Sequence, residues 1–287
     1  MVSADAPVEI VVLGSGSPVP DPGRAGSSLA IVSGDDWLMV DCGRAATQRA
    51  IDAGLDLRRI VAVAMTHHHS DHISDLATLA TTRWAAGAPA PLPVVVPRGP
   101  LARHATRCLE VFDDGSFYGQ SSNGSVRPAI VVHTFDAPTT LARVHGVGAW
   151  NVSSILVDHH PIEPAVGYLV EHLGSRVAVS GDTAVCDAIH QLARDVDALV
   201  HQAVLADHVA PDLLDWNADA RSVGHLAALA RPRHLVLTHL IPAPTSPRQE
   251  MRYVEAVRAA GFKGPTTVAY DLLRIAVPMG PKPESAR

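Results

Sequence analysis

The chain is poor in cysteine, with only three in 287 residues, at positions 42, 108 and 186. These cysteines are widely spaced, odd in number and form no Cys-x-x-Cys pair, so they indicate no disulfide framework. No apolar run approaches the roughly 20 residues that a membrane-spanning helix needs. Residues 1–7 contain neither a basic region nor an apolar core, so no signal peptide is predicted. We therefore expect a reduced, cytoplasmic protein without a membrane partner.

Lysine is also scarce, because Lys263 and Lys282 are the only two in a chain whose formal net charge is −6. The sequence contains no dense basic block. Non-specific binding of nucleic acid depends on cations that displace counterions from phosphates, so this composition argues mildly against it. A local cluster of arginines remains compatible with this composition.

Histidine, in contrast, is abundant, with sixteen in the chain. The densest run is THHHSDH at residues 66–72, directly after an apolar stretch at residues 60–65. That stretch has the character of a buried strand. A surface tract or a leftover affinity tag is the plain alternative, but a tag would be terminal and longer. The position after a strand therefore favours a metal site.

The spacing within this run explains how it could bind cations. Side chains two apart in extended chain point to the same side, so His67 and His69 can hold one cation together. Ser70 or Asp71 resembles a helix N-cap, and a helix starting there turns Asp71 and His72 toward a second cation beside the first. Imidazole and carboxylate donors suit Zn²⁺, with Fe or Mn as alternatives.

The order of elements predicts one α/β domain over residues 1–287, with its core at about 8–277. Each half is read as strands followed by helices, which suggests two sheets face to face with helices outside. Other expectations are a helix at 100–112, a flexible loop at 113–125, a closing strand at 267–277 and a disordered Pro-rich tail at 278–287.

Three further polar groups follow apolar strands, where α/β folds present reactive side chains. They are Asp158-His159-His160, Asp182 and His239. Taken singly, each group is a weak signal for a functional site, because a histidine at a strand end is more often structural and Asp182 could simply cap the next helix. Together with the run at 66–72, they form a strong set.

These motifs give the chain a clear resemblance to the metallo-β-lactamase superfamily, and within it to the ribonuclease Z and arylsulfatase-like branch. The resemblance covers about residues 8–277. It rests on LGSGSP at 13–18, VDCG at 40–43, THHHSDH at 66–72, DHHPIEPAVGY at 158–168, SGDT at 180–183 and LTH at 237–239. It implies an αββα four-layer sandwich.

The resemblance also implies a binuclear site with two divalent cations, most often Zn²⁺, with Mn²⁺ or Fe as alternatives. One metal would be held by His67, His69 and His159, the other by Asp71, His72 and His239, and Asp182 would bridge them. His160 competes with His159 for its role, and we favour His159. Asp71 would also orient the nucleophile or accept its proton. Asp41 and Thr238 are candidates to orient the histidine ligands.

The sequence departs from ribonuclease Z at two places that bear on catalysis. The family's His-Glu-Ala-Thr segment matches His201-Gln202-Ala203-Val204, so an amide replaces the carboxylate. The family's expected proton donor matches Asn217, with His225 two turns further on. We retain His201 and His225, with Asp71, as catalytic candidates. His208 could replace the donor but is expected to be a surface residue.

We therefore expect a metal-dependent hydrolase of a phosphodiester or sulfate ester. No long arm rich in Gly and Pro for holding tRNA is visible, so a small-molecule ester is favoured over tRNA or other RNA. The alternatives are a lactonase or thioesterase and a non-catalytic metal-binding member. A homodimer is expected only because dimers are common in the resembled family.

Overall fold

The computed structural model describes residues 7–112 and 127–277. Within these ranges the strands form two mixed sheets of seven strands each. The first sheet runs, in spatial order, β14 (Arg274–Ala276), β1 (Val8–Gly14), β2 (Ser28–Ser33), β3 (Asp36–Val40), β4 (Ile60–Ala64), β5 (Leu92–Pro97) and β6 (Ile130–Phe135). The second runs β13 (Thr266–Val268), β12 (Leu235–Ile241), β11 (Ala198–Val204), β10 (Ser175–Val179), β9 (Val166–His172), β8 (Trp150–Leu156) and β7 (Ala142–Val147).

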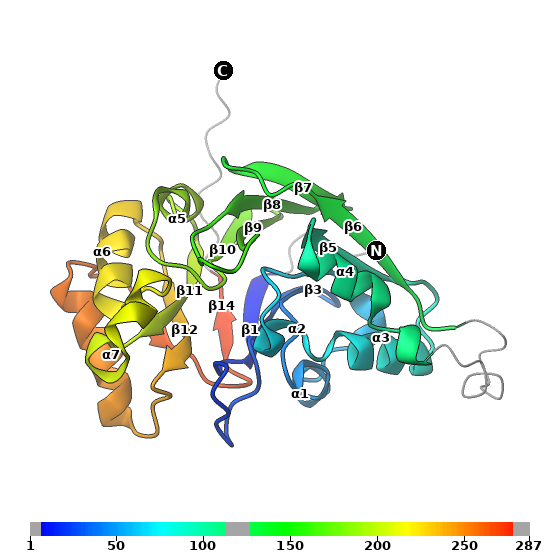
Figure 1. The fold of residues 1–287 in the computed structure, drawn as a ribbon, viewed down its shortest axis with the longest axis horizontal. Coiled ribbons are helices and arrows are strands. Elements are labelled where there is room, and N and C mark those ends of the chain that lie inside the picture. Colours follow the sequence, from blue (N-terminus) through cyan, green and yellow to red (C-terminus); the bar gives the residue numbers. More distant parts are fainter. Residues whose placement is uncertain (1–6, 113–126, 278–287) are drawn as a thin grey trace.

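Helices cover the outer face of each sheet, with α1–α4 on the right of Figure 1 and α5–α7 on the left. The first set is α1 (Ala46–Asp52), α2 (Ser70–Ile73), α3 (Leu76–Ala85) and α4 (Pro100–Arg107). The second set is α5 (Asp187–Leu192), α6 (Ala220–Ala230) and α7 (Pro247–Ala259). This arrangement confirms the predicted αββα sandwich.

Buried apolar side chains form three clusters, one between the two sheets and one between each sheet and its helices. Trp37 belongs to the cluster between the first sheet and its helices, Tyr168 to the cluster between the sheets, and Tyr253 to the cluster beneath α5–α7. Each is fully buried, and burying a large apolar side chain stabilises a fold by about 1.5–3 kcal/mol. The parallel strands β4 and β11 lie inside these layers, which explains why their sequences are continuously apolar rather than alternating.

Several predicted boundaries were wrong. Strand β7 was missed, since its residues are mostly exposed at the edge of the second sheet. The closing strand at 267–277 is two strands in different sheets, because Leu272 has a left-handed φ of 67° and Asp271 accepts hydrogen bonds from Ser15 and Ala25. The helix predicted at 100–112 ends at Arg107.

The helix after residue 70 was also only partly anticipated. It is divided into α2 and α3 at Asp75, whose backbone NH donates to the carbonyl of Cys42 and whose carboxylate accepts from the NH of Thr47. His69 occupies the N-cap position of α2, and no side chain caps it. The predicted cap at Ser70 or Asp71 was therefore wrong, although Asp71 and His72 do lie in the first turn. The predicted loop at 113–125 and the predicted tail at 278–287 lie entirely outside the described residues.

No helix in the described part of the chain is long and apolar enough to cross a membrane.

Candidate metal centre

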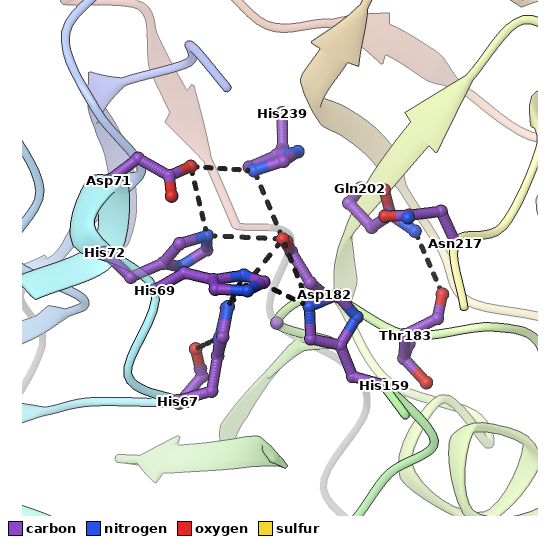
Figure 2. A network of polar contacts seen from close by, with 12 residues as sticks. His67, His69, Asp71, His72, His159, Asp182, Thr183, Gln202, Asn217 and His239 are labelled. Carbon is purple, nitrogen blue, oxygen red and sulfur yellow. Dashed lines mark hydrogen bonds and ion pairs between the residues drawn. The ribbon is translucent and has the colours of Figure 1, made fainter. Parts of the chain in front are cut away.

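Two groups of histidine and aspartate side chains meet where strands of both sheets end (Figure 2). Each group has ligand atoms that lie within 4.8 Å of one another. The first comprises His67, His69, His159 and Asp182, and the second comprises Asp71, His72 and His239. All are buried except His69, which is partly exposed. The structure thus brings together every residue that the sequence nominated as a metal ligand.

Parallel pairing of β3 and β4 builds the base of the first group. Val40 lies opposite Ala64, so Asp41 and Thr66 leave the sheet side by side. The buried carboxylate of Asp41 accepts from the backbone NH of Thr66 at 2.7 Å and from its hydroxyl at 2.9 Å. Asp41 has a φ of 59°, a left-handed conformation that Asp tolerates better than most residues. These bonds fix the loop that carries His67.

This network also sets the proton position on His67. The Thr66 hydroxyl donates its only hydrogen to Asp41, so it accepts from Nδ1 of His67 at 3.0 Å. Nε2 of His67 is then left as a lone pair that faces the cluster. Burial lowers the pKa of His67 well below its usual value, which keeps the ring neutral.

Two more histidines are oriented in the same way. Nδ1 of His72 donates to Asp41 at 2.7 Å, and Nδ1 of His159 donates to the backbone carbonyl of Trp216 at 3.0 Å. Their Nε2 atoms therefore also point into the cluster as lone pairs when the rings are neutral. Partners of this kind commonly fix the tautomer of metal-binding histidines. Asp41 was predicted for this role, whereas Thr66 and the Trp216 carbonyl were not.

The distances within the first group fit a cation. Nδ1 of His69 lies 3.0 Å from Nε2 of His67 and 3.3 Å from Nε2 of His159. Tetrahedral coordination with Zn–N bonds of 2.0–2.1 Å separates ligand nitrogens by about 3.3 Å. In neutral rings, His67 and His159 carry their protons on Nδ1, so at most one proton, on His69, can lie among the three nitrogens that face one another. A shared cation therefore accounts for their close approach better than hydrogen bonds do.

One carboxylate oxygen, Oδ2 of Asp182, lies between the two groups. It is 3.2 Å from Nε2 of His239, 3.4 Å from that of His72 and 3.8 Å from that of His67. Burial alone would raise the pKa of Asp182, but the surrounding imidazoles, His239 first, hold it well below its usual value. An ionised oxygen in this place could contact cations in both groups.

The second group is completed from β12. The register of β11 against β12 shifts after the pair Gln202–Thr238, and His239 has a φ of 50°. Irregularities of this kind re-aim a side chain at a strand end. Nε2 of His239 consequently lies 3.1 Å from Oδ2 of Asp71. Burial opposes protonation of His239, but Asp182 and Asp71 raise its pKa, so the acidic environment that favours a proton would equally favour a cation.

A pocket of about 220 Å³ opens beside both groups. Its lining includes the polar side chains of Asp71, Asp182 and His239 as well as Leu213, Trp216 and Ile241. No lysine or arginine is among the described residues that line it. An anionic substrate in this pocket would therefore be bound through cations held by the ligand groups, because its described lining supplies no such cationic side chain.

The other nominated residues lie in different environments. His160 is exposed, 3.8 Å from Glu163, whereas His159 is buried in the cluster. His201 is fully buried in β11, and burial lowers its pKa to about 4, which disfavours its protonated form near neutral pH. His225 is exposed on α6 and lines no part of the pocket. Their positions give the predicted catalytic roles of His201 and His225 no support.

His208 lies on the surface as expected, where it contacts Asp207 and Arg252. Asn217 lines the pocket and donates from Nδ2 to the carbonyl of Leu213 at 3.2 Å. Trp216 was missed by the sequence reasoning. Its position next to Asn217 is the only indication the sequence offered.

The contrast between His159 and His160 gives a direct test of the ligand set. We predict that His159→Ala lowers metal affinity by more than about tenfold, since even outer-sphere partners of a metal contribute that much. His160→Ala should bind metal like the unmodified protein, because its side chain is exposed. Metal content after dialysis at graded free zinc, measured by mass spectrometry, distinguishes the two. The reverse ranking would transfer the ligand role to His160.

Comparison with known proteins agrees with this geometry. A sequence profile of the Metallo-beta-lactamase superfamily matches residues 21–239. The chain is 36% identical to a Ribonuclease Z of Mycobacterium bovis, over 94% of this chain and 98% of that protein, and 34% identical to one of Mycobacterium marinum, over 94% and 99%. The structure of the short form of human tRNase Z is similar in fold, with a TM-score of 0.71 and 21% identity over 94% of this chain and 99% of that one.

Proposed function

Because this chain belongs to the metallo-β-lactamase superfamily and is a metal-dependent hydrolase, we propose that it cleaves phosphodiesters with a binuclear centre of the ribonuclease Z type. The observation that carries the proposal is the convergence of both ligand groups on Oδ2 of Asp182, next to an open pocket. Full-length similarity to curated ribonuclease Z proteins supports phosphodiesters as the substrate class.

Two divalent cations held here would lower the pKa of bound water to about 7 and stabilise charge on the attacked group and on the leaving oxygen. The residues of the chain have separate tasks. His67, His69 and His159 would hold one cation, Asp71, His72 and His239 the other, and Asp182 would contact both. Zinc is the proposed metal because the donors are imidazole nitrogens and carboxylate oxygens.

Asp71 is the proposed proton acceptor, since its carboxylate lines the pocket as well as the second ligand group. Apart from the proposed ligands, the described pocket residues include no side chain that titrates near neutral pH. Asn217, which lies at the family's donor position, can donate a hydrogen bond but no proton. Substrates with leaving groups that need no protonation should therefore react fastest.

This pocket also favours a second candidate substrate, a small aryl phosphodiester. Leu213, Trp216 and Ile241 could pack against a planar ring, and no basic side chain is among the described lining residues to attract an RNA backbone. Pre-tRNA is the first candidate on the grounds of similarity, and the small ester is the second on the grounds of the pocket. The predicted homodimer and cytoplasmic location stay predictions.

A substrate panel tests the proposal. We expect zinc-loaded protein to hydrolyse bis-p-nitrophenyl phosphate, and to cut a pre-tRNA at the 3′ end of its mature sequence at physiological salt. Hydrolysis of the first without the second would support the small-ester candidate. Activity on p-nitrophenyl sulfate, a lactone or a thioester alone would contradict phosphodiester specificity. Protein that binds well under one metal per chain and cleaves nothing would favour a non-catalytic role.

A further inference from the structure

Gln202 occupies a buried position directly behind the metal centre. It lies in β11 opposite Thr238 of β12, one residue before His239, and is 1% exposed. Its Nε2 lies 2.9 Å from the backbone carbonyl of Thr183, the residue after Asp182. Since a carbonyl only accepts hydrogen bonds, the atom that faces it must be the amide nitrogen. An ionised glutamate could not make this contact.

This bond is one of several that hold the loop carrying Asp182 in place. The Thr183 carbonyl accepts a second bond from the NH of Ala218, at 3.0 Å, and the NH of Ala184 donates to the carbonyl of Asp158 at 2.8 Å. These contacts hold the loop to β11, to the start of α6 and to the segment carrying His159. Of them, only the bond from Gln202 comes from a side chain. It is therefore the contact that a substitution can remove.

Gln202 also lines a small cavity. That cavity has a volume of about 10 Å³ and is lined by Gln202, Thr238 and His239, together with Asp41 and Asp182. Among the residues that line it, three buried side-chain atoms have no hydrogen-bond partner: Oε1 of Gln202, Oγ1 of Thr238 and Nδ1 of His239. The volume is near the roughly 10–15 Å³ that one water molecule requires, and three polar partners suffice to hold it.

The chemistry of His239 requires such an acceptor. If Nε2 of His239 binds a cation, its proton must lie on Nδ1, and a buried N–H without an acceptor costs about 1–3 kcal/mol. A water molecule in the cavity can accept from Nδ1 and donate to both Oε1 of Gln202 and Oγ1 of Thr238. This pattern satisfies all three atoms with one molecule.

We propose that Gln202 is a positioning residue for the metal centre. Its Nε2 holds the Asp182 loop, and its Oε1 orients the ring of His239 through one buried water molecule. The amide is required because one end must donate and the other must accept. This inference rests on the proposed binuclear centre and assigns a task to a residue that takes no part in ligation.

The first test compares Gln202→Glu with Gln191→Glu, a matched change at an exposed position of α5. We expect Gln202→Glu to lower metal affinity by about 10–100-fold, as is typical for a lost partner of a metal ligand. The visible spectrum of the Co²⁺-loaded protein should change as well, because the ligand geometry changes. Gln191→Glu should alter neither. Wild-type affinity and an unaltered spectrum in Gln202→Glu would overturn the proposal.

A second pair keeps the test decisive if Gln202→Glu fails to fold. Thr238→Val preserves shape but removes the hydroxyl that would hold the water, whereas Thr238→Ser keeps it. We expect weaker metal binding and an altered Co²⁺ spectrum for Thr238→Val, and recovery of both in Thr238→Ser. Equal binding by both variants would exclude the water bridge. Binding of fewer than two cations by the unmodified protein would contradict the proposed binuclear centre. Binding of two cations by the unmodified protein and equally by the variants would contradict only the positioning role of Gln202.

Discussion

Replacing Asp182 with asparagine is expected to reduce phosphodiester hydrolysis by about 10³-fold, because electrostatic contributions of single active-site groups reach this size. Oδ2 of Asp182 lies 3.2–4.0 Å from Nε2 atoms in both ligand groups. The amide keeps the shape of the side chain but removes its negative charge. Among the residues that the structure describes, only Asp182 contacts both groups through one oxygen, so its loss should affect both proposed metals.

The measurement for Asp182→Asn combines turnover of bis-p-nitrophenyl phosphate with metal content. Metal content should fall from about two per chain to one or fewer after dialysis, if the cations sit as in known two-metal sites. Asp187→Asn is the control, since Asp187 is exposed at the start of α5. Circular dichroism should show that both variants are folded. An Asp182→Asn protein that retained two metals and activity within tenfold would refute a bridging role.

The second large effect is expected at Asp41, which binds no metal in our assignment. Its carboxylate accepts from the NH and the hydroxyl of Thr66 and from Nδ1 of His72. Asparagine would place an NH₂ group against one of these donors in either orientation. We expect the free energy of unfolding of the metal-free protein to fall by about 2–3 kcal/mol, because buried donors are left without acceptors.

Asp41→Asn should also lower metal affinity by about 10–100-fold, since His67 and His72 both depend on the Asp41 network for their tautomers. Thermal unfolding of metal-free protein should show a Tm lower by roughly 4–12 °C. Asp35→Asn, at an exposed turn, is the control. Unchanged Tm with weakened metal binding would limit Asp41 to orienting His72. Unchanged metal binding would show that Asp41 does not orient the metal ligands.

Much of the fold was accessible from the sequence because its signals are local. The apolar stretch before residue 66 and the hairpin of β9 and β10 around Gly174 were predicted where the structure has them. Strand β7 was not, because an exposed edge strand buries too little to show an apolar pattern. The division of the closing strand between the sheets escaped prediction, since it depends on the long-range contacts of Asp271.

The sequence by itself determined which side chains could form the metal centre, because residue type and spacing at strand ends limit which donors can converge. It could not determine their surroundings. The packing of the two sheets places His159 inside and His160 outside, buries His201, and sets Asp41 behind both His67 and His72. It also sets Gln202 against the Asp182 loop. Burial, tautomer and hydrogen-bond partner depend on residues distant in sequence, so only the tertiary structure decided them.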